Sequence, residues 1–510
     1  MSRDAKPVLA CHSRYTAESI PEHRASQASR HRVHANTPAH RGVPAQQAPT
    51  TPRTPQAIVS APPAGESGHS DVLDMLAARV RRAARPLRTP ADLDPLMDHI
   101  GDARYVLLGE ATHGTSEFYT WRAELTRRLI EERDFSFVAV EGDWPDCYRI
   151  NRYVKRMRGA PTNVEEALHA FERWPTWMWG NREMAFLVEW LREYNFGAGT
   201  EPVGFYGLDV YSLWDSMRAV VEYLERIDPA AARAARRAYG CFEPYYDDEQ
   251  EYARATALVP TSCEDEAVAM LAALRARASE YREDGRESYF DAEQNALVAR
   301  NAEHYYRTMV RGDSASWNVR DRHMVETLER LVHHHGRHAK AIVWEHNTHI
   351  GDARYTDMAR TGMVNVGQLV REAHGESPTD REGVALVGFG THRGKVIAGD
   401  AWGAPPRRMT LPAARAGSWE DVLHRAGRGK DILLLFDGEE HGGIPGLESW
   451  CDHRAVGVVY RPQHEHYGNY VPTQVARRYD AFLFIDETHA LVPMQLPVTH
   501  AEMEAFPSGL

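Results

Sequence analysis

Long apolar runs are missing from this chain of 510 residues. No stretch approaches the roughly 18 consecutive apolar residues that a membrane-spanning helix needs, and the mean hydropathy is −0.53. The amino-terminal residues also lack the apolar core of a secretory signal. We therefore expect no membrane partner and no export signal.

Cysteine is scarce, because the chain has only five, widely spaced and without a CxxC pair. This usage predicts reduced thiols and a cytoplasmic location. The sequence also lacks a GxSxG elbow, a GxxxxGK[ST] loop and a GxGxxG motif after a strand. The usual serine hydrolase, phosphate-loop and dinucleotide-binding classes therefore have no support.

Positive charge is in deficit overall, with 60 Lys and Arg against 72 Asp and Glu, which argues against nucleic-acid binding. Residues 1–66 differ, since they carry a net charge of +4 and nine of the 29 prolines. Such a segment buries too little apolar surface to offset its ordering entropy. We predict a disordered tail over 1–66 and one catalytic domain over 67–510.

Short apolar runs alternate with helical patterns from residue 71 onward. Several runs are continuously apolar, which is typical of strands buried on both faces of a mostly parallel sheet. The sequence thus predicts a three-layer α/β/α fold, with a charged helical insertion over about 212–335 that caps the sheet. The predicted strands are 104–109, 135–140, 203–208, 339–344, 383–389, 431–436, 455–460 and 479–485.

Acidic and imidazole side chains follow four consecutive predicted strands. In open parallel sheets the ligand crevice lies outside the carboxyl ends of the strands. A single such residue is commonly a loop residue or a helix cap, but four strand ends together indicate a site. These residues are Glu110 and His113, then Glu141, then Asp209, and finally Glu345, His346 and His349.

Glu110 and His113 lie three residues apart in a turn bounded by Gly109 and Gly114. Histidine acts as a general base near neutral pH, and a neighbouring carboxylate orients it. Arg122 interrupts the apolar face of the next helix, so it needs a carboxylate partner, Glu110 or Glu141. Arg122 has two possible functional roles, to stabilise an oxyanion or to position a carboxylate. Its structural alternative is to hold the helix against the sheet.

His346 and His349 could form a two-histidine, one-carboxylate metal site with Glu141. An HxxH pair in a loop is a weak indication, and the sequence has neither an HExxH motif nor a set of cysteine ligands. We therefore predict no cofactor and a water nucleophile activated by histidine.

Further side chains are candidates for substrate contact. Trp177 and Trp179 lie in the run WPTWMWGNREM, which either packs in a core or lines a large apolar pocket. His392 follows another strand in GFGTHRGK. The predicted substrate-binding residues are Trp177, Trp179, Asp209 and His392.

Several sequence blocks, in their order and spacing, resemble the erythromycin esterase family over roughly residues 75–497. The blocks are GEATHGTSEFYTWRAELTRRLI, VAVEGDWPDC, WMWGNREM, FYGLDVYS, SWNVRDRHM, EHNTHIGD and the carboxyl-terminal VGVVYRPQHEHYGNYVPTQVARRYDAFLFIDETHALVP. EGDWPD and WMWGNREM look more like the broad environmental branch, some of whose members are named succinoglycan-biosynthesis proteins.

The resemblance implies an α/β core with a helical insertion and hydrolysis of a macrolactone ester, the activity of antibiotic-resistance members. It implies a general-base role for His113 with Glu110 as its acid. The family's other site residues fall on Arg122, Glu141, His346 and His349.

We therefore predict a hydrolase that cleaves a small-molecule carboxylic ester or macrolactone with water activated by His113. Glu141 orients the water, His346 and Arg122 stabilise the oxyanion, and His349 supports His346. The alternatives are a divalent-metal-dependent hydrolase of the same superfamily and a non-enzymatic binder of a small molecule. The oligomeric state is not predicted.

Overall fold

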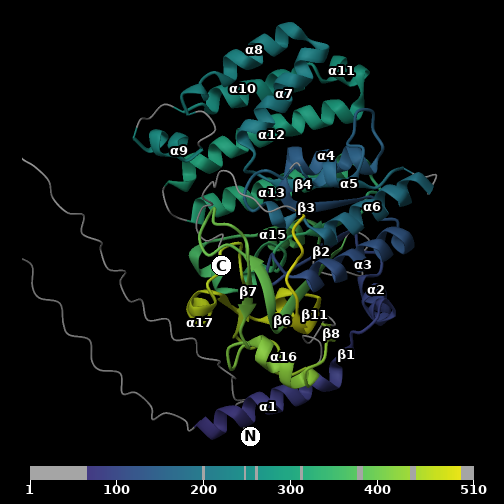
Figure 1. Ribbon diagram of the computed structural model, residues 1–510, viewed down its shortest axis with the longest axis vertical. Helices are drawn as coiled ribbons and strands as arrows, with labels where there is room; N and C mark the ends of the chain where they lie inside the picture. Colours follow the sequence, from purple (N-terminus) through teal and green to yellow (C-terminus); the bar gives the residue numbers. More distant parts are fainter. Residues whose placement is uncertain are drawn as a thin grey trace, which may run out of the picture.

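The structure is a computed structural model, and it describes residues 66–169, 171–197, 201–245, 249–258, 262–310, 314–375, 383–436 and 444–494. The predicted disordered tail therefore lies outside the described residues, apart from Glu66, which begins the first helix. Figure 1 shows a central sheet with helices on both sides and a group of helices beyond one edge.

Six parallel strands form the centre of the main sheet, in the order β4-β3-β5-β2-β6-β11. β8 and then β1 extend it antiparallel beyond β11, and β7 pairs antiparallel with β6. β9 and β10 form a separate two-stranded sheet. The described strands are β1 (Arg85–Pro86), β2 (Tyr105–Leu108), β3 (Phe137–Asp143), β4 (Gly204–Asp209), β5 (Ala341–Trp344), β6 (Val384–Ala398), β7 (Arg407–Leu411), β8 (Ile432–Leu435), β9 (Cys451–Arg454), β10 (Tyr470–Thr473) and β11 (Ala481–Thr488).

Alternate strand residues point to opposite faces, and each face has its own hydrophobic core. Val106 and Leu108 of β2 join one core with α2, α3 and α6, whereas Tyr105 and Leu107 join the other with α1, α13, α15 and α16. The predicted three-layer α/β/α class is thereby confirmed. The helices around the sheet are α1 (Glu66–Ala83), α2 (Asp94–Ile100), α3 (Ser116–Arg133), α4 (Trp144–Val154), α5 (Val164–Leu168), α6 (Arg182–Gly197), α13 (Ser314–His335), α14 (Asn347–Ile350), α15 (Val366–His374), α16 (Trp419–Gly427), α17 (Glu465–Gly468) and α18 (Val475–Arg478).

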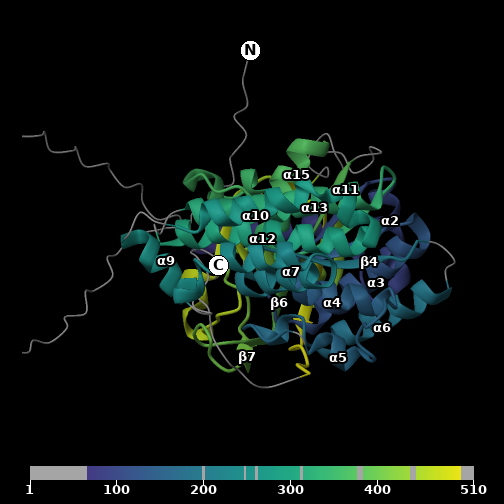
Figure 2. The same cartoon turned by 90° about the horizontal axis from the view of Figure 1, so that it is seen from above.

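The helical insertion has a third core of its own, built mainly from α7, α8, α10 and α12. It stands beyond the β4 edge, at the opposite end of the molecule from α1 and α16 (Figure 1), and covers the body when the molecule is seen from above (Figure 2). α13, by contrast, packs on the sheet through Met324 and Leu328. The insertion helices are α7 (Leu213–Ile227), α8 (Pro229–Tyr239), α9 (Glu249–Leu258), α10 (Glu264–Ala276), α11 (Ala278–Tyr281) and α12 (Arg286–Met309).

Seven of the eight predicted strands are present, and the prediction for 455–460 is wrong. β9 ends at Arg454, and the following residues make only isolated bridges, from Val456 to Thr112 and from Val459 to Gly399. An apolar run predicts burial, and these residues are largely buried, but no neighbouring strand supplies a continuous ladder there.

Two further expectations concern cysteines and membranes. Cys241 and Cys263, 22 residues apart in the insertion, form a disulfide with a Cα–Cα distance of 6.0 Å. The expectation of reduced thiols is therefore wrong for this pair, because the fold brings together cysteines that lack a pairing motif. Among the described helices, none combines the length and apolar character of a membrane span.

Candidate active site

The carboxyl ends of the central parallel strands gather the acidic and imidazole side chains at one edge of the sheet. Leu108 of β2 and Val140 of β3 both pair in register with Trp344 of β5. The segments that follow these residues therefore start at the same level and lie next to each other. They bring together Glu110, His113, Glu141, Glu345, His346 and His349, and β4 adds Asp209 at its last residue.

The first charged cluster consists of Glu110, His113 and Arg122. One carboxylate oxygen of Glu110 lies 2.8 Å from Nδ1 of His113, and the other accepts a hydrogen bond of 2.6 Å from Nη2 of Arg122. Glu110 and Arg122 are fully buried, and the Arg122 guanidinium lies against the rings of Tyr119 and Trp344. Of the two predicted partners for Arg122, the structure shows Glu110.

This arrangement sets the tautomer of His113. An ionised carboxylate only accepts hydrogen bonds, so Nδ1 of His113 carries the proton and donates it to Glu110. Nε2 then keeps its lone pair, as a general base requires.

The turn that carries Glu110 and His113 has no room for a side chain at either flanking glycine. A Cβ added to Gly114 would lie 1.9 Å from the Ile397 carbonyl oxygen, and one added to Gly109 would lie 2.1 Å from Oδ1 of Asn347.

The second charged cluster surrounds Arg320 of α13. Its guanidinium donates to both carboxylate oxygens of Asp209, at 3.0 and 2.7 Å, and to Oε1 of Glu141 at 2.8 Å. Nη1 lies 3.1 Å from Nε2 of His349, whose Nδ1 lies 2.9 Å from Asp321. Trp317 stacks on the His349 ring, with centroids 4.5 Å apart. Five buried side chains are thus fixed around one cation.

The charges of this cluster keep two of its carboxylates, Glu141 and Asp209, ionised. Burial acts to raise the pKa of Glu141, but His349, Arg320 and His113 together lower it well below its usual range. Burial likewise opposes ionisation of Asp209, and Arg320 reverses the effect and lowers its pKa. Glu141 also accepts a hydrogen bond of 2.8 Å from the peptide N–H of His346.

His346 and Glu345 are both kept neutral. Burial, and then the neighbouring His113, lower the pKa of His346 well below its usual value, and the two rings have centroids 4.8 Å apart. Nδ1 of His346 lies 2.8 Å from Oγ1 of Thr348 and 3.3 Å from the peptide nitrogen of the same residue. Burial and the nearby Glu141 raise the pKa of Glu345, whose carboxyl oxygens are buried without a hydrogen-bond partner among the described residues.

A small cavity of about 40 Å³ opens between these clusters and a tryptophan-rich segment. Its volume suits about three water molecules. Nε1 of Trp179 donates to the carbonyl of Glu141 at 2.9 Å, which fixes this segment against β3. The lining residues are His113, Glu141, Gly142, Asp143, Asp146, Phe171, Arg173, Trp174, Pro175, Met178, Trp179, Asp209, Arg320 and Val458.

The structure does not bring every predicted residue to this cavity. Arg122 is buried behind Glu110, and Trp177 is buried in the core beside the cavity rather than in its wall. His392 stacks on His424, with ring centroids 3.7 Å apart, away from the lining residues. Asp209, Trp179, Glu141 and His113 do line it. Cys147 is buried nearby, and burial raises its pKa, which keeps the thiol protonated.

Sequence reasoning missed Arg320, Asp321 and Asp143. Arg320 and Asp321 are buried within an amphipathic helix whose apolar face includes Trp317 and Met324. A charge on the apolar face of a helix was the pattern that drew attention to Arg122, and it would have found Arg320 as well. Asp143 lies within the EGDW block, two residues after Glu141.

Two of the three donors of the alternative metal site, His349 and Glu141, are already engaged. Both ring nitrogens of His349 face charged partners, and the Arg320 guanidinium lies between Glu141 and Asp209. Within the described ranges, no three His, Cys, Asp or Glu side chains converge in a metal-binding arrangement. His349 and Glu141 therefore do not fit the alternative metal site, because other charged side chains hold them.

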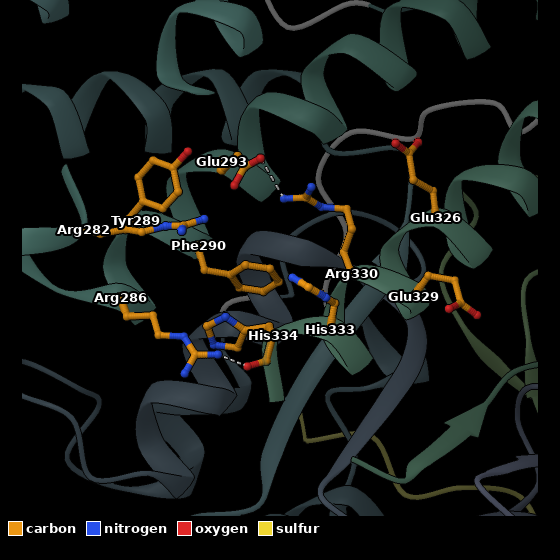
Figure 3. Close-up of a pocket in the computed structure, with 10 residues that line it drawn as sticks. All are labelled: Arg282, Arg286, Tyr289, Phe290, Glu293, Glu326, Glu329, Arg330, His333 and His334. Atoms are coloured by element: carbon orange, nitrogen blue, oxygen red, sulfur yellow. Dashed lines mark hydrogen bonds and ion pairs between the residues drawn. The ribbon is translucent and has the colours of Figure 1, made fainter. Parts of the chain in front are cut away.

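A larger cavity of about 520 Å³ lies elsewhere, between α12 and the carboxyl-terminal half of α13 (Figure 3). Its glutamates already have partners: Glu293 pairs with Arg275 and Arg330, Glu326 with Arg300, and Glu329 with His374. α13 continues from there into β5, so this cavity lies toward the amino ends of the strands. The candidate catalytic groups lie at the opposite edge of the sheet.

Comparisons with known proteins agree with this architecture. A family model described as erythromycin esterase matches residues 130–488. The chain is 33% identical over 119 residues to erythromycin esterase type II of Escherichia coli, a match that spans 23% of this chain and 26% of that protein.

Solved structures share the fold. A crystal structure of a succinoglycan biosynthesis protein superposes with a TM-score of 0.68 at 21% identity, over 84% of this chain and 100% of that one. The structure of a protein from Bacillus cereus superposes with a TM-score of 0.68 at 19% identity, over 83% of this chain and 99% of that one. The structure of an erythromycin esterase mutant in its open conformation superposes with a TM-score of 0.59 at 18% identity, over 79% of this chain and 98% of that one. The family model covers well over half of the chain, so the resemblance found in the sequence is confirmed and the chain belongs to the erythromycin esterase family.

Proposed function

We propose that this protein hydrolyses a carboxylic ester or lactone with a water molecule activated by His113. The observation that carries the proposal is the buried hydrogen bond from His113 to Glu110, with the histidine lining the same cavity as Glu141. Membership of the erythromycin esterase family supports ester hydrolysis as the reaction class.

His113 acts as the general base. Its Nε2 takes a proton from water while the water oxygen attacks the carbonyl carbon, and Glu110 stabilises the imidazolium that forms. The tetrahedral intermediate then expels the alcohol oxygen, which recovers the proton from Nε2. Arg122 contacts neither water nor substrate in this scheme. It is a positioning residue, because it holds the second oxygen of Glu110.

Glu141 and Arg320 complete the site from the other side. The ionised Glu141 accepts a hydrogen bond from the attacking water and orients it. Arg320 has five N–H bonds, of which four face Asp209, Glu141 and His349. Within the described part of the chain, one N–H on Nη1 is left for the developing oxyanion. His346 does not line the cavity; its ring packs beside that of His113, with centroids 4.8 Å apart, and we assign it a positioning role. His349 holds Arg320 in place.

The size of the cavity bears on the substrate. Sites for drug-sized ligands have volumes of roughly 300–1,000 Å³, well above the 40 Å³ of this cavity. A macrolactone therefore enters only if the tryptophan-rich segment moves outward. Small esters need a smaller displacement, so we propose them as the first substrates to test, with macrolides beside them.

The test is hydrolysis of a panel of small esters, lactones and erythromycin by the wild type and the His113→Ala variant. A positioned general base contributes roughly 10²–10⁴-fold, so we expect kcat to fall by that factor while the melting temperature changes little. His489→Ala is the matched control, since His489 pairs with a glutamate at the surface. Near-full activity of the His113→Ala variant on its best ester would rule the mechanism out, and activity lost to a chelator would favour the metal-dependent alternative.

A further inference from the structure

The cavity between α12 and α13 has no part in the proposed ester hydrolysis. One face of each helix lines it, because its lining residues recur every three or four positions, as in Arg286, Phe290 and Glu293 of α12. Its volume of about 520 Å³ lies within the roughly 300–1,000 Å³ that is typical of sites for drug-sized ligands. The cavity is therefore large enough for a ligand of its own.

The acidic side chains of this wall are already balanced. Each of its three glutamates pairs with a basic side chain that does not line the cavity, namely Arg275, Arg300 or His374. The wall itself carries three arginines and two histidines. Of these, Arg330 also pairs with a wall glutamate, Glu293. The remaining basic groups are in excess over the acids that they face.

Two arginines of the wall have no carboxylate partner among the described side chains. The guanidinium of Arg282 lies over the Tyr289 ring, 5.2 Å from its centroid, and Nη2 of Arg286 donates to the peptide carbonyl of His334. A guanidinium has five N–H donors, so both arginines keep donors for a ligand. Both residues are exposed to solvent, so a ligand can reach them.

An apolar surface separates the charged parts of the wall. The Phe290 ring stacks on His334 with centroids 4.0 Å apart. In Figure 3 Phe290 lies between the two arginines, Arg282 and Arg286, and the two glutamates, Glu326 and Glu329. The cavity thus offers an anion-binding end next to an aromatic surface.

We propose that this cavity is a second binding site, for a small aromatic molecule with an acidic group. Arg282 and Arg286 hold the anion, and the aromatic body packs against Phe290. Guanidinium groups bind carboxylate and phosphate oxygens through paired N–H donors, whereas a neutral ligand would leave these two cations without a counterion. The site does not depend on the esterase mechanism, because the catalytic groups line a different cavity at the opposite edge of the sheet.

The experiment titrates three probes into the full chain by isothermal titration calorimetry. Phenylphosphonate has both the ring and the anion, inorganic phosphate has only the anion, and benzyl alcohol has only the ring. We expect phenylphosphonate to bind at least about tenfold more tightly than either partial probe, because only it uses both parts of the wall. Equal affinity for phenylphosphonate and either partial probe would overturn the proposal.

Substitutions test where phenylphosphonate binds. Arg282→Ala and Arg286→Ala should each weaken its affinity about tenfold, the effect of losing one charge-assisted contact. Arg226→Ala is the matched control, since Arg226 is also exposed and lies over a tyrosine ring, 5.8 Å from the centroid, but outside the cavity. It should keep the wild-type affinity.

The His113→Ala variant separates the two cavities. It should bind phenylphosphonate with wild-type affinity, whether or not the wild type hydrolyses any ester. Binding that is lost in His113→Ala, or that is unchanged in both arginine variants, would show that the probe does not occupy this cavity and would overturn the proposal.

Discussion

The two buried charge clusters at the sheet edge differ in how the chain builds them. Glu110, His113 and Arg122 come from 13 consecutive residues and meet through two hydrogen bonds on one carboxylate. The cluster around Arg320 takes Glu141 from β3, Asp209 from β4, Arg320 and Asp321 from α13, and His349 from α14. The first cluster is a local motif that tunes one histidine. The second ties four elements together around one cation.

The comparison predicts that Arg320 matters more for stability than Arg122. Arg320→Met leaves Glu141 and Asp209 buried without their cation, and we expect unfolding to become easier by about 3–5 kcal/mol. Arg122→Met removes the cation only from Glu110, which keeps His113 as a partner. We therefore expect this variant to lose less stability than Arg320→Met. Urea unfolding of both variants measures the difference in stability. The control is Arg393→Met, which breaks the exposed Arg393–Glu487 pair and should change stability by less than about 1 kcal/mol. Equal losses for Arg320 and Arg122 would show that the two clusters do not differ in this way.

The catalytic contribution should lie mainly in the local cluster. In Glu110→Gln the side-chain amide can donate to Nδ1 of His113, which moves the ring proton to Nε2 and removes the base. We expect kcat to fall by about 10²-fold or more, with a small change in melting temperature. Glu117→Gln is the matched control, because Glu117 pairs with His489 at the surface. An unaltered kcat in Glu110→Gln would separate Glu110 from the reaction.

The smallest expected effect concerns Glu345, which lies beside the second cluster. Its pKa is raised in the folded state by burial and by Glu141, whereas the unfolded chain ionises it near pH 4.3. Its contribution to stability is thus fully present below that pH and is lost as the pH rises toward the folded pKa. Glu345→Gln cannot ionise, so its stability relative to the wild type should increase as the pH rises from 5 to 8. Urea unfolding of the wild type and the variant at pH 5 and pH 8 measures this change. An equal stability difference between the two proteins at both pH values would contradict the raised pKa of Glu345.

Much of the fold could be predicted because burial leaves a periodic trace in the sequence. The apolar runs indicated all six central parallel strands. The short antiparallel strands β1, β7, β9 and β10 were not predicted, and the run at 455–460 was taken for a strand. In these places pairing depends on which neighbour is present, and an apolar run does not report that.

The sequence alone determined the local chemistry. It placed Glu110 and His113 in one turn, put Arg122 on the apolar face of the next helix and indicated the strand ends as the candidate site. These relations span only a few residues along one chain direction. Only the tertiary structure decided that Arg122 binds Glu110, that Arg320 is the cation between Glu141 and Asp209, and that His392 lies elsewhere. Those outcomes depend on which distant elements pack together, and a buried charge takes whichever partner the packing brings within hydrogen-bond distance.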